Sequence, residues 1–198
     1  MNLHGVEKPV RRRTGGRSAR VREAVLRAAL EALTEFGAGG LTFTEIGRRA
    51  GVHATSVQRR WGSRENVLLD ALLSFSQEKL PIPNTGSLRG DLIAFAQGLT
   101  SYLTSPLGKT VVRTMAANED DLPMANSRAE FIRLRFEAAG VMIDRAADRG
   151  ELRPGTERQM ALELLSAPLY LRALITRQPI DDSFVERVVD TLMHGLAK

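Results

Sequence analysis

The sequence predicts an all-α protein, and three observations support this class. Apolar residues recur at intervals of three and four along most of the 198-residue chain, which is the period of an amphipathic helix. The alternation typical of a strand is nearly absent, and aromatic residues make up only 5% of the chain. Glycine or proline ends most of the periodic segments. About nine helices and no strands are therefore expected.

Four helices are expected before the strongest break in the chain. They cover about residues 18–36, 43–50, 54–61 and 64–79. Thr42 and Glu45 have the spacing of a capping box, and Ser63 is placed to cap the fourth helix. The break follows at residues 81–86, which contain two prolines and a glycine, so a linker or sharp loop is expected there.

Five further helices are expected after this break. They cover about residues 87–104, 106–117, 127–150, 156–177 and 183–197. The last three each begin at a capping-box sequence, at Ser127, Thr156 and Ser183. Residues 118–125 are polar and are expected to form a loop, and Pro168 should kink the helix that contains it.

The charge distribution suggests that one end of the chain meets a polyanion. Residues 1–64 contain 13 Lys and Arg against 5 Asp and Glu, whereas residues 65–198 contain 15 against 18. A solvated basic tail would give the same numbers, so charge alone does not decide. The chain has no cysteine, which excludes disulfides, thiolate metal sites and cysteine nucleophiles. No apolar run reaches about 18 residues, so no membrane span is expected.

Residues 42–64 have the pattern of a helix-turn-helix. Two short helices meet through Ala50-Gly51-Val52, where glycine permits a turn with positive φ. Apolar residues such as Ile46 and Val57 are placed to pack against the first helix. The outer positions are polar or basic: His53, Thr55, Ser56, Gln58, Arg59 and Arg60. A recognition helix needs this division, because one side is held while the other enters the major groove.

This region resembles the tetracycline-repressor (TetR) family of bacterial regulators. The matching residues are Phe36-Gly37, Thr44, Ile46, Ala50-Gly51-Val52, Trp61, Ser63, Arg64 and Glu65. The resemblance implies that Thr42 and Thr44 bind phosphate at a helix N-terminus, that Arg64 binds phosphate after the recognition helix, and that the outer positions face the groove.

The sequence departs from the family pattern within the recognition helix. The family commonly has Tyr at the position of Gln58 and His at that of Arg60. Gln binds adenine and Arg binds guanine through paired hydrogen bonds. Gln58 together with Arg59 or Arg60 is therefore expected to read bases more directly than is typical. The backbone contact that the family's Tyr often makes is not assumed for Gln58.

We expect three segments: a basic flexible arm over residues 1–17, a DNA-binding domain over 18–64, and a ligand-binding and dimerisation domain over 65–198. The arm, through Arg17 and other basic residues, contacts DNA or is only a solubilising tail. Trp61, the only tryptophan, is expected to anchor the recognition helix rather than to stack on a base.

The family resemblance weakens after about residue 80 but implies a ligand cavity and a dimer interface. The helix expected over 156–177 is apolar almost all round, which a second subunit would bury more easily than one monomeric core. The expected interface residues are Leu165, Leu169, Leu174, Val185, Val188, Val189 and Leu192. The expected cavity residues are Phe95, Leu99, Tyr102, Met115, Phe131, Arg135, Met142 and Tyr170, although aromatic and Met positions at helical spacing are more often plain core.

These observations predict a cytoplasmic homodimeric regulator that binds a palindromic operator in double-stranded DNA. It is expected to be a repressor relieved by a small apolar or amphipathic ligand, without a cofactor, metal or membrane partner. The alternative is a DNA-binding regulator without a small-molecule ligand, controlled by a partner protein or architectural. A void-free core between residues 87 and 150 would favour the alternative, and a roomy apolar cavity would favour the first. No enzyme is expected, because no catalytic motif occurs and the three histidines are scattered.

Overall fold

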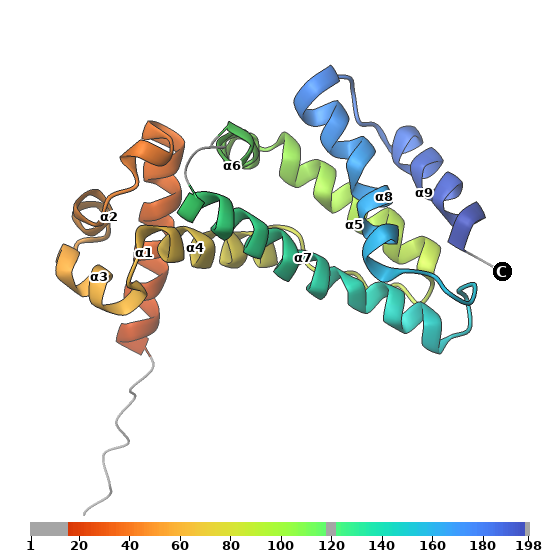
Figure 1. Cartoon of the computed structure of the whole chain (residues 1–198), viewed down its shortest axis with the longest axis horizontal. Coiled ribbons are helices and arrows are strands. Elements are labelled where there is room, and N and C mark those ends of the chain that lie inside the picture. Colours follow the sequence, from red (N-terminus) through yellow and green to blue (C-terminus); the bar gives the residue numbers. More distant parts are fainter. Residues whose placement is uncertain (1–15, 118–121, 197–198) are drawn as a thin grey trace, which may run out of the picture.

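The computed structural model describes residues 16–117 and 122–196, and within these ranges the chain folds into nine α-helices without strands. The predicted all-α class is confirmed. The helices are α1 (Gly16–Phe36), α2 (Phe43–Ala50), α3 (Ala54–Trp61), α4 (Arg64–Lys79), α5 (Leu88–Thr104), α6 (Pro106–Ala117), α7 (Leu122–Asp148), α8 (Arg158–Tyr170) and α9 (Asp182–Leu196). Helices α1, α2 and α3 form one end of the molecule, α8 and α9 lie at the other, and α4 and α7 run between them (Figure 1).

The N-terminal end, which we call the head, has its own apolar core. Buried residues of α1 pack against Ile46 of α2 and Val57 of α3. The first half of α4 completes this core through Val67, Leu68 and Leu72. The head therefore extends past residue 64, where the sequence suggested its boundary, because α4 covers a face that α1 to α3 leave apolar.

The remaining helices, which we call the body, enclose a second core. Helix α5 lies against α7, α8 and α9, and its buried side chains include Leu92, Ala96 and Leu103. The loop between α4 and α5, residues 80–87, contains the expected break at residues 81–86. Two body helices also reach the head, because Val111 of α6 and Phe131 of α7 are buried in the head core. The two cores are thus in contact through α4, α6 and α7.

The helix caps agree with the sequence in the first half of the chain and differ in the second. The hydroxyls of Thr42 and Ser63 accept hydrogen bonds from the backbone N–H three residues later, both at 3.1 Å. Ser127, in contrast, lies inside α7, because that helix already begins at Leu122. Its first turn covers part of the loop expected over residues 118–125, and residues 118–121 lie outside the described ranges.

The starts of the last two helices also differ from the expectation. Helix α8 begins at Arg158 after Glu157, and the Thr156 hydroxyl donates back to the Arg153 carbonyl at 2.8 Å instead of capping the helix. At the start of α9, the Asp181 carboxylate accepts from the Phe184 N–H at 2.8 Å, so Asp181 and not Ser183 caps the helix.

Helix α8 has two apolar faces. Ala161, Leu162, Leu165 and Leu169 are buried in the body core. The opposite stripe, spaced four, three, four and four residues apart, is exposed: Met160, Leu164, Ala167, Leu171 and Ile175. After Pro168 the backbone changes to a π-helical segment, Leu171–Thr176, where the sequence predicted a kink. Proline lacks the N–H that would continue the α-helical ladder at this point.

Candidate nucleic-acid interface and internal cavity

Helices α2 and α3 form a helix-turn-helix at the end of the head. Gly51 turns the chain with φ of 66°, the left-handed conformation that the sequence predicted and that glycine adopts without strain. Its N–H caps α2 at the Gly47 carbonyl. Val57 of α3 is buried in the head core, so the other side of α3 faces outward. This is the arrangement that groove recognition requires.

The outward side of α3 carries the side chains expected to meet bases. His53, Thr55, Ser56, Gln58, Arg59 and Arg60 are all exposed. At 100° per residue, Thr55 and Arg59 lie opposite Val57, while Ser56 and Gln58 flank them. Arg59 therefore points more directly away from the head core than Gln58 does.

Arg60 is held against the head instead of projecting freely. Its guanidinium lies 4.9 Å from the centroid of the Trp61 ring, and its Nη1 approaches the Ser18 hydroxyl oxygen at 3.4 Å. Leaving the ring would give up a cation–π contact, so extending the Arg60 side chain outward has a cost that Arg59 does not bear. Ser18 lies in the first turns of α1, so Arg60 also connects α3 to α1.

Trp61 anchors the C-terminal end of the recognition helix. Its indole Nε1 donates to the Asp70 carboxylate of α4 at 2.9 Å, and its ring packs on the head core. Arg22 of α1 donates to the same carboxylate and forms an ion pair with it. One carboxylate thus connects α1, α3 and α4. Asp70 could not be identified from the sequence, because its role depends on the contact of α4 with α1 and α3.

The residues assigned to phosphate binding lie on the rim of this surface. Thr42 and Thr44 are exposed at the start of α2, and the Thr42 hydroxyl already caps that helix. Arg64, in the first turn of α4, is half-buried and forms an ion pair with Glu65 at 2.7 Å. Arg17 is exposed in the first turn of α1. The other basic residues of the arm, at positions 8–13, lie outside the described residues.

Glu45 binds the two arginines at the C-terminal end of α2. Its carboxylate accepts from Arg48 Nε at 2.8 Å and from Arg49 Nε at 2.5 Å, and these bonds lower the pKa of Glu45 to about 2. The carboxylate is therefore not free to bond back to the Thr42 N–H, and only half of the expected capping box forms. Arg49 also pairs with Glu35 of α1, so it has a structural role.

An internal cavity lies in the body between the end of α4 and the middle of α7. A narrow chamber of about 40 Å³ lies beside a second one of about 190 Å³, and Tyr102, Phe131 and Tyr170 line both. Six of the eight expected residues line the narrow chamber: Phe95, Leu99, Tyr102, Phe131, Arg135 and Tyr170. Met142 is fully buried in the body core and lines neither chamber, and the side chain of Met115 lies outside the described residues. Five further residues line this chamber: Ser76, Leu80, Ile132, Phe136 and Ser166.

The polar groups of this cavity are strongly desolvated. Arg135 is only 8% exposed, and its Nη2 donates to the Leu80 carbonyl at 2.9 Å. Burial lowers the pKa of Arg135 and raises the pKa of Tyr102 and of Tyr170, because it disfavours the charged form of each group. The Tyr102 hydroxyl is buried without a hydrogen-bond partner among the described residues.

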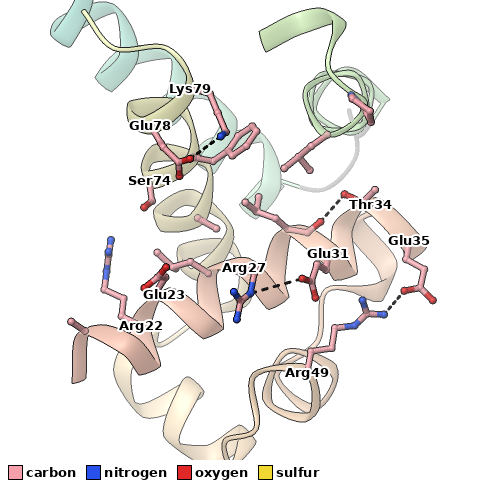
Figure 2. A pocket seen from close by; sticks show the side chains of 17 residues that line it. Arg22, Glu23, Arg27, Glu31, Thr34, Glu35, Arg49, Ser74, Glu78 and Lys79 are labelled. Atoms are coloured by element: carbon pink, nitrogen blue, oxygen red, sulfur yellow. Dashed lines mark hydrogen bonds and ion pairs between the residues drawn. The ribbon is translucent and has the colours of Figure 1, made fainter. Parts of the chain in front are cut away.

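A wider groove of about 1050 Å³ lies between the head and α6. Its floor is apolar, with Leu30 of α1, Phe75 of α4 and Leu107 of α6 among its residues. Charged side chains surround it, and Figure 2 shows three ion pairs among them: Arg27 with Glu31, Arg49 with Glu35 and Lys79 with Glu78. Since most of these charges already form ion pairs, the groove is a weaker candidate for a ligand site than the cavity of Arg135.

The structure corrects the expected dimer interface. Leu165, Leu169, Val185, Val189 and Leu192 are buried within their own chain, so they belong to the body core and are unavailable to a second subunit. Leu174 and Val188 are half-buried. The longest uncovered apolar stripe of the described residues is instead the one that runs from Met160 on α8 to Ile175 in the π-helical segment, where Leu164 is 53% and Ile175 73% exposed. Sequence periodicity shows that both faces are apolar but not which one the same chain covers.

Within the described ranges, no group of three His, Cys, Asp or Glu side chains is placed to hold a metal ion. No helix in these ranges is both long and apolar enough to cross a membrane.

Comparison with known proteins agrees with this geometry. Residues 25–71 match the family described as bacterial regulatory proteins of the tetR family, and residues 82–192 match the tetracyclin repressor-like C-terminal domain. The chain is 34% identical over 179 residues to the HTH-type transcriptional regulator AqdR of Rhodococcus erythropolis, covering 90% of this chain and 86% of that protein. It is 30% identical over 175 residues to the uncharacterised HTH-type regulator YdeS of Bacillus subtilis, covering 88% of each.

Among solved structures, the TetR family transcription regulator SCO0332 superimposes with a TM-score of 0.75 at 30% identity, covering 90% of this chain and all of that one. The helix-turn-helix, the helical body and these relatives together place the chain in a family of DNA-binding regulators that are not enzymes. The chain belongs to the TetR family of transcriptional regulators.

Proposed function

We propose that this regulator is a homodimeric repressor that releases a palindromic operator when a small apolar or amphipathic molecule binds in the cavity of Arg135. The observation that carries this proposal is the position of Phe131. This side chain lines both chambers of the cavity and is buried in the head core. A molecule that moves Phe131 must therefore disturb the packing behind the recognition helix.

Helix α4 offers a second connection between cavity and head. Phe75 packs against both cores, and its ring centroid lies 5.6 Å from that of Tyr102, which lines the cavity. The same helix begins at Arg64, three residues after the recognition helix ends. Interiors are close-packed, so a displaced Tyr102 transmits its shift to α4. Ligand binding then favours a spacing of the two heads that fits DNA poorly.

The dimer is supported by the exposed stripe of α8. Five apolar positions in a row along one helix face, from Met160 to Ile175, are more than scattered surface hydrophobics. Pairing through this stripe about a two-fold axis gives two recognition helices, and such dimers bind half-sites about 34–36 Å apart. The operator is then a palindrome, and the protein works where bacterial DNA lies, in the cytoplasm.

The DNA part of the proposal is tested by selecting DNA fragments with the purified full-length protein. The selected fragments should share an inverted repeat, and binding measured by fluorescence anisotropy at moderate salt should exceed that of a scrambled fragment by at least roughly 10³-fold. Equal affinity for both fragments would refute the function.

The dimer is tested by Leu164→Glu, which places a carboxylate in the middle of the stripe. Its burial in an interface should raise the dimer dissociation constant by roughly 10²-fold or more in sedimentation measurements. The matched control is Ala147→Glu, at an exposed position near the end of α7. Unchanged association of the Leu164 variant would rule out this interface.

Ligand control is tested separately, by adding small molecules to the operator complex. Release of operator DNA by a compound that also raises the Tm of the free protein supports the cavity as the effector site. If only a second protein releases the complex, the regulator is controlled by a partner and the cavity is core.

A further inference from the structure

The cavity contains a buried positive charge that no carboxylate of the described residues neutralises. Among the described residues, no carboxylate forms an ion pair with the Arg135 guanidinium, whose one hydrogen bond is to the Leu80 carbonyl. Arg145, ten residues further along α7, shows the usual solution, because it lies 3.5 Å from the buried carboxylate of Asp91. A buried charge without a counter-charge is unfavourable unless something binds to it.

A second donor lies in the same chamber. The Tyr102 hydroxyl has no partner among the described residues, and Arg135 is near enough to influence the ionisation of both Tyr102 and Tyr170. Nearly all buried hydroxyls in proteins are hydrogen-bonded, so an unsatisfied one beside an unpaired guanidinium is unusual. Both groups are hydrogen-bond donors, and together they suit an acceptor with negative charge. Apart from these groups and Ser76 and Ser166, the chamber wall is apolar.

The neighbouring chamber is shaped for an apolar group. It measures about 190 Å³, and most of its wall comes from aliphatic and aromatic side chains. The lining residues are Val111, Val112, Phe131, Ile132, Tyr102 and Tyr170, together with one charged residue, Arg128. A cavity of about 150 Å³ is large enough to hold benzene. The space thus suits one ring or a short alkyl chain, attached to a head group that reaches Arg135.

The Leu80 carbonyl connects this charge to the head. Leu80 is the C-cap residue of α4, so the hydrogen bond from Arg135 holds the end of that helix. A carboxylate accepts paired bonds from a guanidinium and competes with a single neutral carbonyl for it. Binding of an anion therefore loosens the end of the helix that starts beside the DNA interface.

We propose that the cavity binds an organic acid, a carboxylate joined to one ring or a short alkyl chain. The carboxylate replaces the Leu80 carbonyl as the hydrogen-bond acceptor of Arg135 and also accepts a hydrogen bond from the Tyr102 hydroxyl. This inference rests on the proposed function, because it names the chemical class of the effector. The competing explanation is that Arg135 only caps α4, which would explain its hydrogen bond but neither the missing counter-charge nor the unsatisfied hydroxyl.

The test uses the full-length protein and matched pairs of probes: benzoate with benzamide, phenylacetate with phenylacetamide, and hexanoate with hexanamide. Calorimetry should show that at least one acid binds the wild type roughly tenfold or more tightly than its amide. Arg135→Met should abolish this preference, and Tyr102→Phe should lower the affinity for the acid by roughly two- to tenfold. The control Arg133→Met, at an exposed position on the same helix, should keep the preference.

Thermal unfolding without ligand gives a second reading. If the charge of Arg135 serves a ligand, Arg135→Met should leave the Tm unchanged or raise it, because an unpaired buried charge is lost. A drop of several degrees, together with no preference for acids, would show that Arg135 only caps α4. Failure of all three acids to bind at millimolar concentration would also overturn the inference.

The two proposals fail in distinguishable ways. If acids do not release the operator but a neutral apolar compound does, ligand control stands and the acidic class is wrong. If no sequence-specific DNA complex forms at all, the proposed function itself fails.

Discussion

The carboxylate of Asp70 should determine how firmly the recognition helix is held, and its replacement provides a quantitative test. Asp70 Oδ2 accepts from Trp61 Nε1 at 2.9 Å and from Arg22 Nε at 3.2 Å. A hydrogen bond to a charged group contributes about 1.5–3 kcal/mol, and the lower half applies here because the Asp70 side chain is 29% exposed. The ion pair with Arg22, which is 41% exposed, adds at most about 1 kcal/mol.

Asp70→Ala should therefore lower the free energy of unfolding by about 2–3 kcal/mol. Asp70→Asn keeps an acceptor for the indole but loses the charge, so its loss should be about 1 kcal/mol. Trp61 is the only tryptophan, and urea unfolding followed by its fluorescence at fixed protein concentration reports on this end of the molecule.

Operator affinity gives an independent measurement on the same variants. Asp70→Ala should weaken the binding of all DNA sequences to the same extent, because the substitution loosens the end of α3 without removing a side chain that reads bases. The control is Asp148→Ala, at an exposed position at the far end of α7. If both Asp70 variants unfold within about 0.3 kcal/mol of the wild type, the reasoning about this anchor is wrong.

Three further outcomes follow from the head. Arg59→Ala should reduce the preference for one base pair of the operator by about 1–3 kcal/mol. Arg64→Ala should instead weaken the binding of all DNA sequences and make binding less dependent on salt concentration. Identical effects of the two variants in a binding selection would contradict this division of roles. Thr42→Val should destabilise the head by about 1 kcal/mol in urea unfolding, because the N-cap bond at 3.1 Å is lost, and an unchanged midpoint would argue against the cap. Since the folded pKa of Glu45 is lowered from 4.5 to about 2, its contribution is present above pH 4.5 and is lost as the pH falls toward 2. The Tm difference between wild type and Glu45→Gln should therefore be constant near neutral pH and disappear near pH 2.

Much of this fold was predictable because its helices have local start and stop signals. Glycines end α1, α2 and α3, and the hydroxyls of Thr42 and Ser63 mark two of the starts. The start of α7 was not predictable from its capping sequence, because Ser127 and Glu130 fit a helix interior as well as a helix start. Pro123 lies in the first turn of that helix, where proline is tolerated, and this was the better signal.

The site was predictable in residue type but not in detail. The amphipathic pattern of residues 54–61 indicated which side of the recognition helix is exposed, but it could not show that Arg60 stacks on Trp61 while Arg59 stays outward. Likewise, Arg135 stood out as a polar residue on a mostly apolar helix, and its lack of a carboxylate partner in the described ranges depends on which helices face α7. The two faces of α8 are equally apolar, so only tertiary packing separates core from interface.

The sharing of α4 between two cores has a practical consequence for exchanging heads among relatives. A fragment that stops after the recognition helix, near residue 64, would leave behind Val67, Leu68 and Leu72 and expose the apolar side of α1 that they cover. A chimera joined in the loop after Leu80 keeps those side chains in the exchanged head. Position 75 then comes from the relative, so Tyr102 of the body packs against a different residue. Specificity for DNA and response to an effector are therefore expected to be transferable only when the residues at positions 75 and 102 are exchanged together.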